Sequence, residues 1–283
     1  MIKIKKINEV HVAPIKLPKP PKHILGSDLF NQVSANILIC APKNSGKTVV
    51  VKKILDECAG KDTNVIIFCG TVNNDPSWLE IKKDLSKKKI SLISFTSIFD
   101  DKLNLVEALI KALQQGNVKD NPSVDNKLEP LRKPGSQLIL TNSDDLKKIN
   151  GDNGIPVIEK KPKNVSPDYI IVFDDISNEL KDKSIPKLMK IHRHFSSKII
   201  ISTQSWKDTS SSIRKGNLDY LLLFKNINEE TLDTIHQELS ITIPLRMFKE
   251  MYYHATSEIY HFFLIDRNGQ FRKDFDSQYE IPE

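Results

Sequence analysis

Five short runs of almost wholly apolar residues constrain the fold of this chain more than any other feature. They occupy residues 36–40, 65–69, 169–173, 198–202 and 220–224. Each run has the length of a strand but lacks the alternation of a strand with one face in water, so each is expected to be covered on both faces. Right-handed crossovers then place the carboxyl ends of these strands at one edge of the sheet, where ligands bind. We therefore predict an α/β fold with a mostly parallel central sheet flanked by helices.

The segments between and after these runs complete this pattern. A further strand is expected at 91–95, and helical spacing of apolar residues predicts helices at 48–58, 103–114, 185–195, 229–239 and about 245–255. The apolar run 258–265 is followed by Asn268 and Gly269, a pair typical of tight β-turns. We expect a C-terminal β-hairpin there.

Composition divides the chain into an arm and one domain. Residues 1–25 contain six lysines and one acidic residue, and four prolines between positions 14 and 21 prevent a continuous helix. We therefore interpret 1–33 as an extended basic N-terminal arm and 34–283 as the domain. Within the domain, 117–166 is rich in Pro, Asn, Asp, Gly and Lys, which predicts a mobile insertion.

Charge and cysteine usage narrow the cellular setting. The net charge of +6 is modest, and the five lysines of 82–89 fit either contact with phosphates or a solvated surface. No apolar run approaches the roughly 18 residues of a membrane span, and the N-terminus does not resemble a signal peptide. The three cysteines show no CxxC spacing. We expect reduced, buried cysteines in an intracellular protein without a membrane span or a zinc site.

The sequence APKNSGKT at positions 41–48 is the sharpest chemical signal. It matches the P-loop pattern GxxxxGK(S/T) except that Ala41 replaces the first glycine, and it lies between a predicted strand and a predicted helix. In such a loop, backbone N–H groups surround a β-phosphate, Lys47 reaches the β- and γ-phosphates, and Thr48 holds Mg²⁺. Alanine resists positive φ, so Ala41 could store strain, but it offers no side-chain atom to phosphate. The predicted nucleotide-binding residues are Ala41, Pro42, Lys43, Asn44, Ser45, Gly46, Lys47 and Thr48.

Two acidic residues, Asp174 and Asp175, close the run 169–173 as in a Walker B motif. A carboxylate at that strand end can enter the Mg²⁺ shell near Thr48, which we expect of Asp174. RecA-like ATPases carry a second acidic residue as the general base for the attacking water, and we assign that role to Asp175. Because aspartate is shorter than glutamate, the water has to approach by about one methylene. The open alternative is an aspartate pair that only caps a turn.

Three further polar residues are candidates for the catalytic site. Gln204 follows the apolar run 198–202 and is a candidate sensor of the γ-phosphate, the alternative being an ordinary loop residue. A transition-state cation has to come from a mobile element or a neighbouring subunit, and Arg193 and Arg214 are the two candidates. The alternative for each is a surface residue.

Taken together, the motifs APKNSGKT, IIVFDD, RHF, IIISTQS and IRKGNLDYLLLF resemble those of the genome-packaging ATPases of large eukaryotic DNA viruses and virophages. These enzymes are the poxvirus-type branch of the FtsK/HerA superfamily, and the resemblance covers roughly residues 34–265. It implies a RecA-like P-loop NTPase fold, ATP and Mg²⁺ as cofactors, and a homo-oligomeric ring. It also implies translocation of double-stranded DNA into a preformed capsid, contact with capsid or packaging-vertex proteins, and a location in the host cytoplasm, a viral factory or the virion.

Within this resemblance Lys47 and Thr48 bind phosphate and Mg²⁺, Asp174 enters the Mg²⁺ shell, Asp175 activates water, Gln204 senses, and Arg193 or Arg214 acts across subunits. A competing hypothesis is a nucleotide-dependent switch or scaffold with little hydrolysis, which needs neither a base nor a sensor. A small-molecule kinase is less favoured because the sequence shows no arginine-rich lid.

Overall fold

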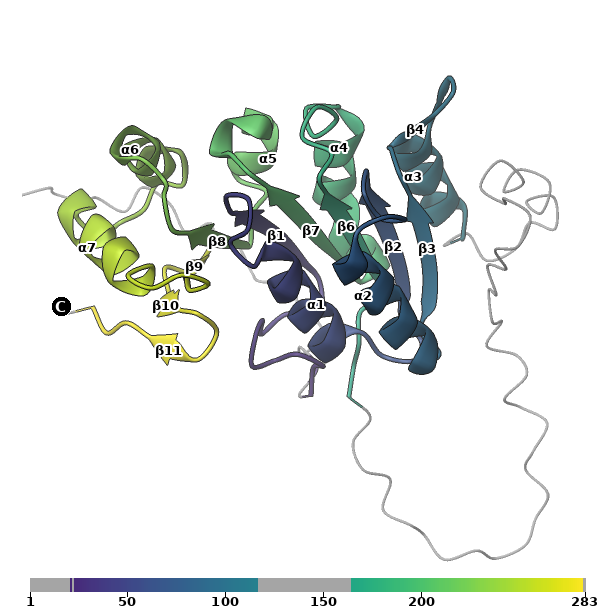
Figure 1. Ribbon diagram of the computed structural model, residues 1–283, viewed down its shortest axis with the longest axis horizontal. Helices are drawn as coiled ribbons and strands as arrows, with labels where there is room; N and C mark the ends of the chain where they lie inside the picture. The colour runs from purple at the N-terminus through teal and green to yellow at the C-terminus, as the bar shows by residue number, and fades with distance from the viewer. Residues whose placement is uncertain (1–20, 22, 117–163, 282–283) are drawn as a thin grey trace, which may run out of the picture.

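A nine-stranded sheet forms the centre of the computed structural model, which describes residues 21, 23–116 and 164–281 (Figure 1). The strand order is β11-β10-β9-β8-β1-β7-β6-β2-β3. The strands from β8 to β3 run parallel, whereas β9, β10 and β11 are antiparallel. The strands are β1 (Ala35–Cys40), β2 (Asn64–Cys69), β3 (Ser91–Phe95), β6 (Tyr169–Asp174), β7 (Ser197–Thr203), β8 (Tyr220–Phe224), β9 (Phe262–Asp266), β10 (Phe271–Lys273) and β11 (Ser277–Gln278).

Helices cover both faces of this sheet. One face packs against α1 and α2, and the other against α3 to α7, in two separate hydrophobic clusters. Successive residues of β1 alternate between the clusters, with Ile37 and Ile39 on the first side and Leu38 and Cys40 on the second. The elements are α1 (Lys47–Cys58), α2 (Pro76–Lys87), α3 (Leu105–Gly116), α4 (Ser184–Ile191), α5 (Ser211–Arg214), α6 (Glu229–Glu238), α7 (Leu245–Ala255), the 3₁₀ turns η4 (His192–Phe195) and η5 (Trp206–Asp208), and a small hairpin of β4 (Phe99–Asp100) and β5 (Leu103–Asn104).

The predicted fold class is confirmed. The parallel core is buried on both faces, which explains why its strands lack polar alternation. The C-terminal hairpin is also present: β9 and β10 pair antiparallel, and the turn between them contains Gly269 at φ 82°. Strand β7 lies between β1 and β6. The apolar pattern of the sequence does not predict this strand order.

Helix α2 differs from the prediction, which places no helix between residues 69 and 91. Asp75 caps this helix by accepting from the Ser77 N–H group (2.7 Å), and Pro76 occupies its first turn. The buried side chains of Trp78, Ile81 and Leu85 follow helical spacing.

Among the five lysines of 82–89, two at the end of α2 and just after it have acidic partners. Lys87 pairs with Asp84 and Lys88 with Asp56. These ion pairs favour the interpretation of the lysine-rich segment 82–89 as a solvated surface over its interpretation as a phosphate-binding site.

Two other boundaries differ from the prediction. The segment expected to form one helix, 185–195, consists of α4 followed by the separate 3₁₀ turn η4. Ser196, at φ 46°, ends this turn. The apolar run 258–265 enters the sheet only at Phe262, because Tyr260 has φ 71°, which is incompatible with a regular strand.

The described part of the predicted arm packs against the domain. Leu29 and Phe30 are buried, and the Phe30 ring packs against Tyr220 with centroids 4.7 Å apart. Ile24 forms a bridge with Val165, so the predicted arm meets the end of the predicted insertion. Residues 1–20, 22 and 117–163 lie outside the described part, and the predictions for them stay predictions.

The described cysteines match the expectation, because Cys40, Cys58 and Cys69 are unpaired by disulfides and buried. Burial raises the thiol pKa of Cys40 to about 12 and that of Cys58 to about 11. In the part of the chain that the structure describes, no helix combines the length and apolar character needed to cross a membrane.

Lys198 predicts a pH dependence of stability. Its side chain on β7 is buried, donates to the Gln32 carbonyl and lies 5.7 Å from the centre of the Phe30 ring. Burial lowers its pKa from 10.5 to about 8. Between these values the unfolded chain binds the proton more tightly than the folded chain, so the contribution of Lys198 to stability increases as pH rises through this window.

We therefore expect the free energy of unfolding of the wild type to rise relative to that of Lys198→Met between about pH 8 and 10.5, by up to about 3 kcal/mol. Chemical denaturation of both proteins at several pH values measures this difference. A difference that does not change with pH would contradict a buried ammonium.

Candidate active site

The loop between β1 and α1 has the curled shape that a phosphate-binding loop requires. Gly46 caps α1 at φ 89°, a conformation that residues with a side chain rarely adopt, and Asn44 is also left-handed at φ 59°. The Ala41 N–H group donates to the Thr203 carbonyl (2.9 Å), and the Ser45 hydroxyl donates to the Pro42 carbonyl (2.7 Å). Ala41 is not among the described residues with positive φ, so its replacement of glycine stores no strain of that kind.

The first turn of α1 is suited to an anion. Its leading N–H groups have no partner within the helix, and the helix dipole adds partial positive charge there. Lys47 is the first residue of α1, and the described first turn contains no acidic residue. Pro42 and Lys43 complete the loop, and Lys43 is exposed. The eight residues predicted to bind nucleotide thus form one continuous loop and helix start.

Lys47 joins the two Walker motifs directly. Its ammonium lies 3.1 Å from Oδ1 of Asp174, at the carboxyl end of β6, and these side chains are only 15% and 3% exposed. The indole N–H of Trp78 donates to Oδ2 of the same carboxylate (3.2 Å). Because β7 separates β1 from β6, this ion pair reaches across a strand. The carboxylate of Asp174 is therefore held between α1 and α2.

Asp175 differs from Asp174 in its exposure and in its backbone conformation. It is exposed, whereas Asp174 is buried, and it adopts φ 52°. A Cβ atom built on Gly70 would lie 3.2 Å from the Asp175 carbonyl oxygen, so the chain after β2 approaches this turn closely. Left-handed backbone at a non-glycine residue is uncommon and is concentrated at functional sites.

Gln204 follows β7 at the same edge of the sheet and is half-buried. The turn after it is fixed by hydrogen bonds: Thr203 Oγ1 donates to Asp208 Oδ2 (3.0 Å), and Ser205 and Asp208 form a capping box. Gln204 thus follows the strand that lies between the two Walker strands. Its role as a sensor stays a prediction.

Two buried oxygens near the P-loop fit a Mg²⁺ ion. Asp174 Oδ1 is buried with the Lys47 ammonium as its ion-pair partner, whereas Ser202 Oγ is buried and has no hydrogen-bond partner among the described residues. Ser202 lies opposite Asp174 in the register of β6 and β7. Mg²⁺ prefers oxygen ligands and usually takes one or two from the protein and the rest from phosphates and water. Thr48 and Asp174 are the residues that would hold it.

Sequence reasoning missed Trp78 and Ser202. Ser202 had a weak signal, as a polar residue inside an apolar strand. Among the described residues there is no group of three or more His, Cys, Asp or Glu side chains that could hold a metal alone.

The two candidate arginines lie elsewhere. Arg193, in η4, is 60% exposed and donates to Asp219 (3.1 Å) near the amino end of β8, opposite to the P-loop edge. Burial opposes ionisation of Asp219, but hydrogen bonds from His192 and from the Asn36 N–H group, with the Arg193 charge, lower its pKa overall. Arg193 therefore cannot reach the P-loop of its own chain, and its action across subunits stays a prediction.

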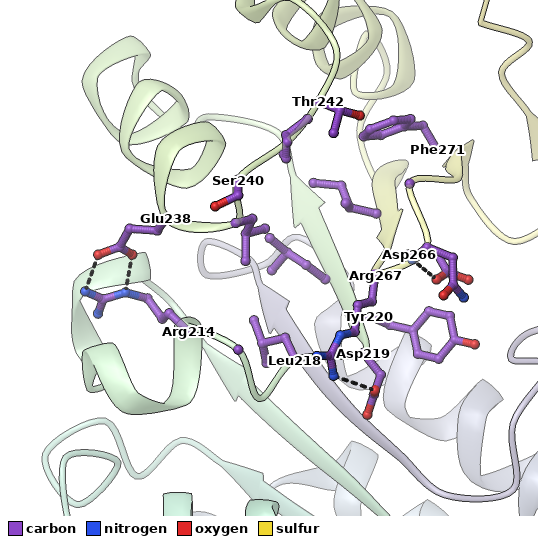
Figure 2. Close-up of a pocket in the computed structure, with 17 residues that line it drawn as sticks. Arg214, Leu218, Asp219, Tyr220, Glu238, Ser240, Thr242, Asp266, Arg267 and Phe271 are labelled. Atoms are coloured by element: carbon purple, nitrogen blue, oxygen red, sulfur yellow. Dashed lines mark hydrogen bonds and ion pairs between the residues drawn. The ribbon is translucent and has the colours of Figure 1, made fainter. Parts of the chain in front are cut away.

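Arg214 is held by a two-pronged contact with Glu238, with N–O distances of 2.7 and 3.2 Å (Figure 2). Its guanidinium also donates to the Trp206 carbonyl and lies 5.4 Å from the Trp206 ring centre. Arg214 and Glu238 line a cavity of about 450 Å³ beside β8. The contacts with Glu238 and Trp206 give Arg214 a structural role within the chain, and its proposed role as a finger is likewise untested.

Comparisons with known proteins identify only structural likeness. No family model matches the chain, and no curated protein matches it. Among solved structures, the genome-packaging NTPase B204 from Sulfolobus turreted icosahedral virus 2, in complex with AMP, is 13% identical with a TM-score of 0.49, covering 89% of this chain and 100% of its own. The pCW3 conjugation coupling protein TcpA is 15% identical with a TM-score of 0.45, covering 83% and 57%.

The cytoplasmic domain of the type VII secretion ATPase EccC from Thermomonospora curvata is 16% identical, with a TM-score of 0.46 over 89% of this chain and 26% of its own. Likeness at these values does not establish a shared activity. The sheet and the P-loop of this chain, described above, themselves show a P-loop α/β fold.

The Lys47–Asp174 pair makes a prediction that needs no ligand. Removing one partner of a buried ion pair leaves an uncompensated charge, so Lys47→Met should lower the free energy of unfolding by about 3 kcal/mol. The double variant with Asp174→Asn should lose less than the sum of the single losses, by about 1–2 kcal/mol. Chemical denaturation of the four proteins measures this coupling, and strictly additive losses would show that the two side chains do not interact.

Proposed function

We propose that this protein hydrolyses ATP with Mg²⁺ at the carboxyl edge of its sheet. The observation that carries this proposal is the arrangement around Asp174: a P-loop lysine paired with a buried strand-end carboxylate, and an exposed aspartate immediately after it. Phosphate, metal and water then have separate partners within one short stretch of the site.

The roles of the residues follow from their surroundings. The free N–H groups of the P-loop and of α1 bind the phosphates, which replace Asp174 as the partner of Lys47. The released carboxylate and Thr48 would hold Mg²⁺, and the ion would supply positive charge beside the transferred phosphoryl group. Asp175 is exposed, so it can accept a proton from a water molecule that approaches the γ-phosphate.

We further propose that hydrolysis drives the translocation of double-stranded DNA into a viral capsid by a homo-oligomeric ring, in the host cytoplasm, a viral factory or the virion. Support for this finer proposal comes from the motif resemblance over residues 34–265. Arg193 is compatible with a contact to a neighbouring subunit, since its side chain is largely exposed and its guanidinium donates to Asp219 alone among the described residues. The capsid or packaging-vertex partner rests on the same resemblance.

Asp175→Asn tests the catalytic assignment. The amide cannot accept the proton, so we expect ATP affinity within about two-fold of the wild type and a loss of at least a hundred-fold in hydrolysis. Lys47→Ala should instead lose both, because one ammonium contacts the bound phosphates and the developing charge. Calorimetric titration with ATP and a phosphate-release assay measure the two effects.

A matched control is Asp101→Asn, since Asp101 is also exposed and has the same φ of 52°. It should leave both quantities unchanged. Hydrolysis at the wild-type rate in Asp175→Asn would rule out Asp175 as the base, and absence of hydrolysis in the wild type would favour the nucleotide-dependent switch.

A further inference from the structure

The segment 257–261 brings an aromatic ring to the P-loop from a distant part of the sequence. It connects α7 to β9, and β9 begins opposite Phe224, at the carboxyl end of β8. Since β8 pairs with β1, this segment lies at the same edge as the loop. A Cβ atom on Gly46 would be only 3.1 Å from Cδ1 of Tyr260, so the ring lies against the P-loop glycine.

Large apolar side chains are exposed around this contact. Tyr260 is 62% exposed, Ile259 is 67% exposed, and Val49 is 70% exposed. The Val49 N–H group donates to the Gly46 carbonyl (3.0 Å), which places Val49 one helical turn after the glycine that Tyr260 approaches. We call Val49, Ile259 and Tyr260 the apolar platform. It flanks a loop whose other exposed groups are polar or charged.

The backbone of Tyr260 is held in an unfavourable conformation. Its φ of 71° is rare for a bulky residue and raises the energy of the folded state. The chain is fixed on both sides: Lys225 donates to the Ser257 carbonyl (2.6 Å), and the Asp274 carboxylate bonds the His261 ring (2.5 Å) and the Phe262 N–H group (3.0 Å). Such strain persists only where the surroundings impose it, and it is concentrated at ligand sites.

We propose that Tyr260 stacks on the base of the nucleotide whose phosphates occupy the P-loop, with Val49 and Ile259 covering the apolar edge of the nucleoside. This inference rests on the nucleotide site proposed above. A base is tethered to its phosphates through one ribose, so it has to lie beside the loop, where the platform offers the exposed aromatic face. Stacking uses a π face that every base has, so it binds the base without selecting strongly among ATP, GTP and other nucleoside triphosphates.

Binding of two ligands separates this role from phosphate binding. ATP carries a base, whereas inorganic tripolyphosphate does not. In calorimetric titrations, Tyr260→Ala should weaken ATP binding about ten-fold, within the five- to hundred-fold range of base–aromatic stacking, and should leave tripolyphosphate binding unchanged. Tyr260→Phe should restore the wild-type affinity for ATP. Tyr253→Ala removes another exposed tyrosine, on α7, and should change neither ligand.

Tyr260→Gly separates the loss of stacking from a loss of folding. Glycine adopts this φ without strain, so the variant should melt at or above the wild-type temperature and still bind ATP about ten-fold more weakly. Unchanged ATP affinity in Tyr260→Ala, or equal weakening of both ligands, would overturn the stacking role while leaving the P-loop assignment intact, provided that Lys47→Ala weakens both. A wild-type protein that binds neither ligand would overturn both proposals.

Discussion

The ion pair between Lys47 and Asp174 is the interaction on which the geometry of this site depends. A carboxylate buried at the end of β6 needs a positive partner, and the P-loop lysine supplies it across the intervening strand β7. The Trp78 indole N–H adds a second restraint, from α2. The two Walker motifs are thus joined by this ion pair in the absence of a nucleotide. A phosphate bound as we propose would have to compete with Asp174 for the lysine. In the mechanism that we propose, this competition would free the carboxylate to hold Mg²⁺.

The sheet, the P-loop and the hairpin could be predicted from the sequence alone, because each is encoded by a pattern of neighbouring residues. Strands buried on both faces lack alternation, and the glycine of a capping turn stands at a fixed offset from Lys47. Helix α2 was not predicted, because the lysines on its exposed side obscure the helical spacing of the apolar residues Trp78, Ile81 and Leu85. Ser202 and Trp78 approach Asp174 only through strand register and helix packing, which no local pattern encodes. For the same reason, the partners of Arg193 and Arg214 became visible only in the fold.

The last third of the chain closes the site. β8 lies beside β1, the strand that leads into the P-loop, and β9 pairs with β8. The segment 257–261, which precedes β9, therefore lies next to the P-loop. Its anchors on Lys225 and Asp274 hold Tyr260 in a strained conformation against Gly46. The opposite edge is different in character: Arg193 and Arg267 surround the buried Asp219 there. One edge thus carries the P-loop and the strand-end aspartates, and the other presents exposed arginines.

Phosphate release from ATP, measured with and without Mg²⁺ and with and without linear double-stranded DNA, tests the central claim most directly. The account predicts release that requires Mg²⁺ and increases several-fold when DNA is added, because the proposed motor couples turnover to its track. Binding of ATP without any release above the buffer rate, whether or not DNA is present, would contradict an ATPase and identify a nucleotide-dependent switch. Mg²⁺-dependent release that DNA leaves unchanged would contradict the coupling to DNA and leave only the hydrolase.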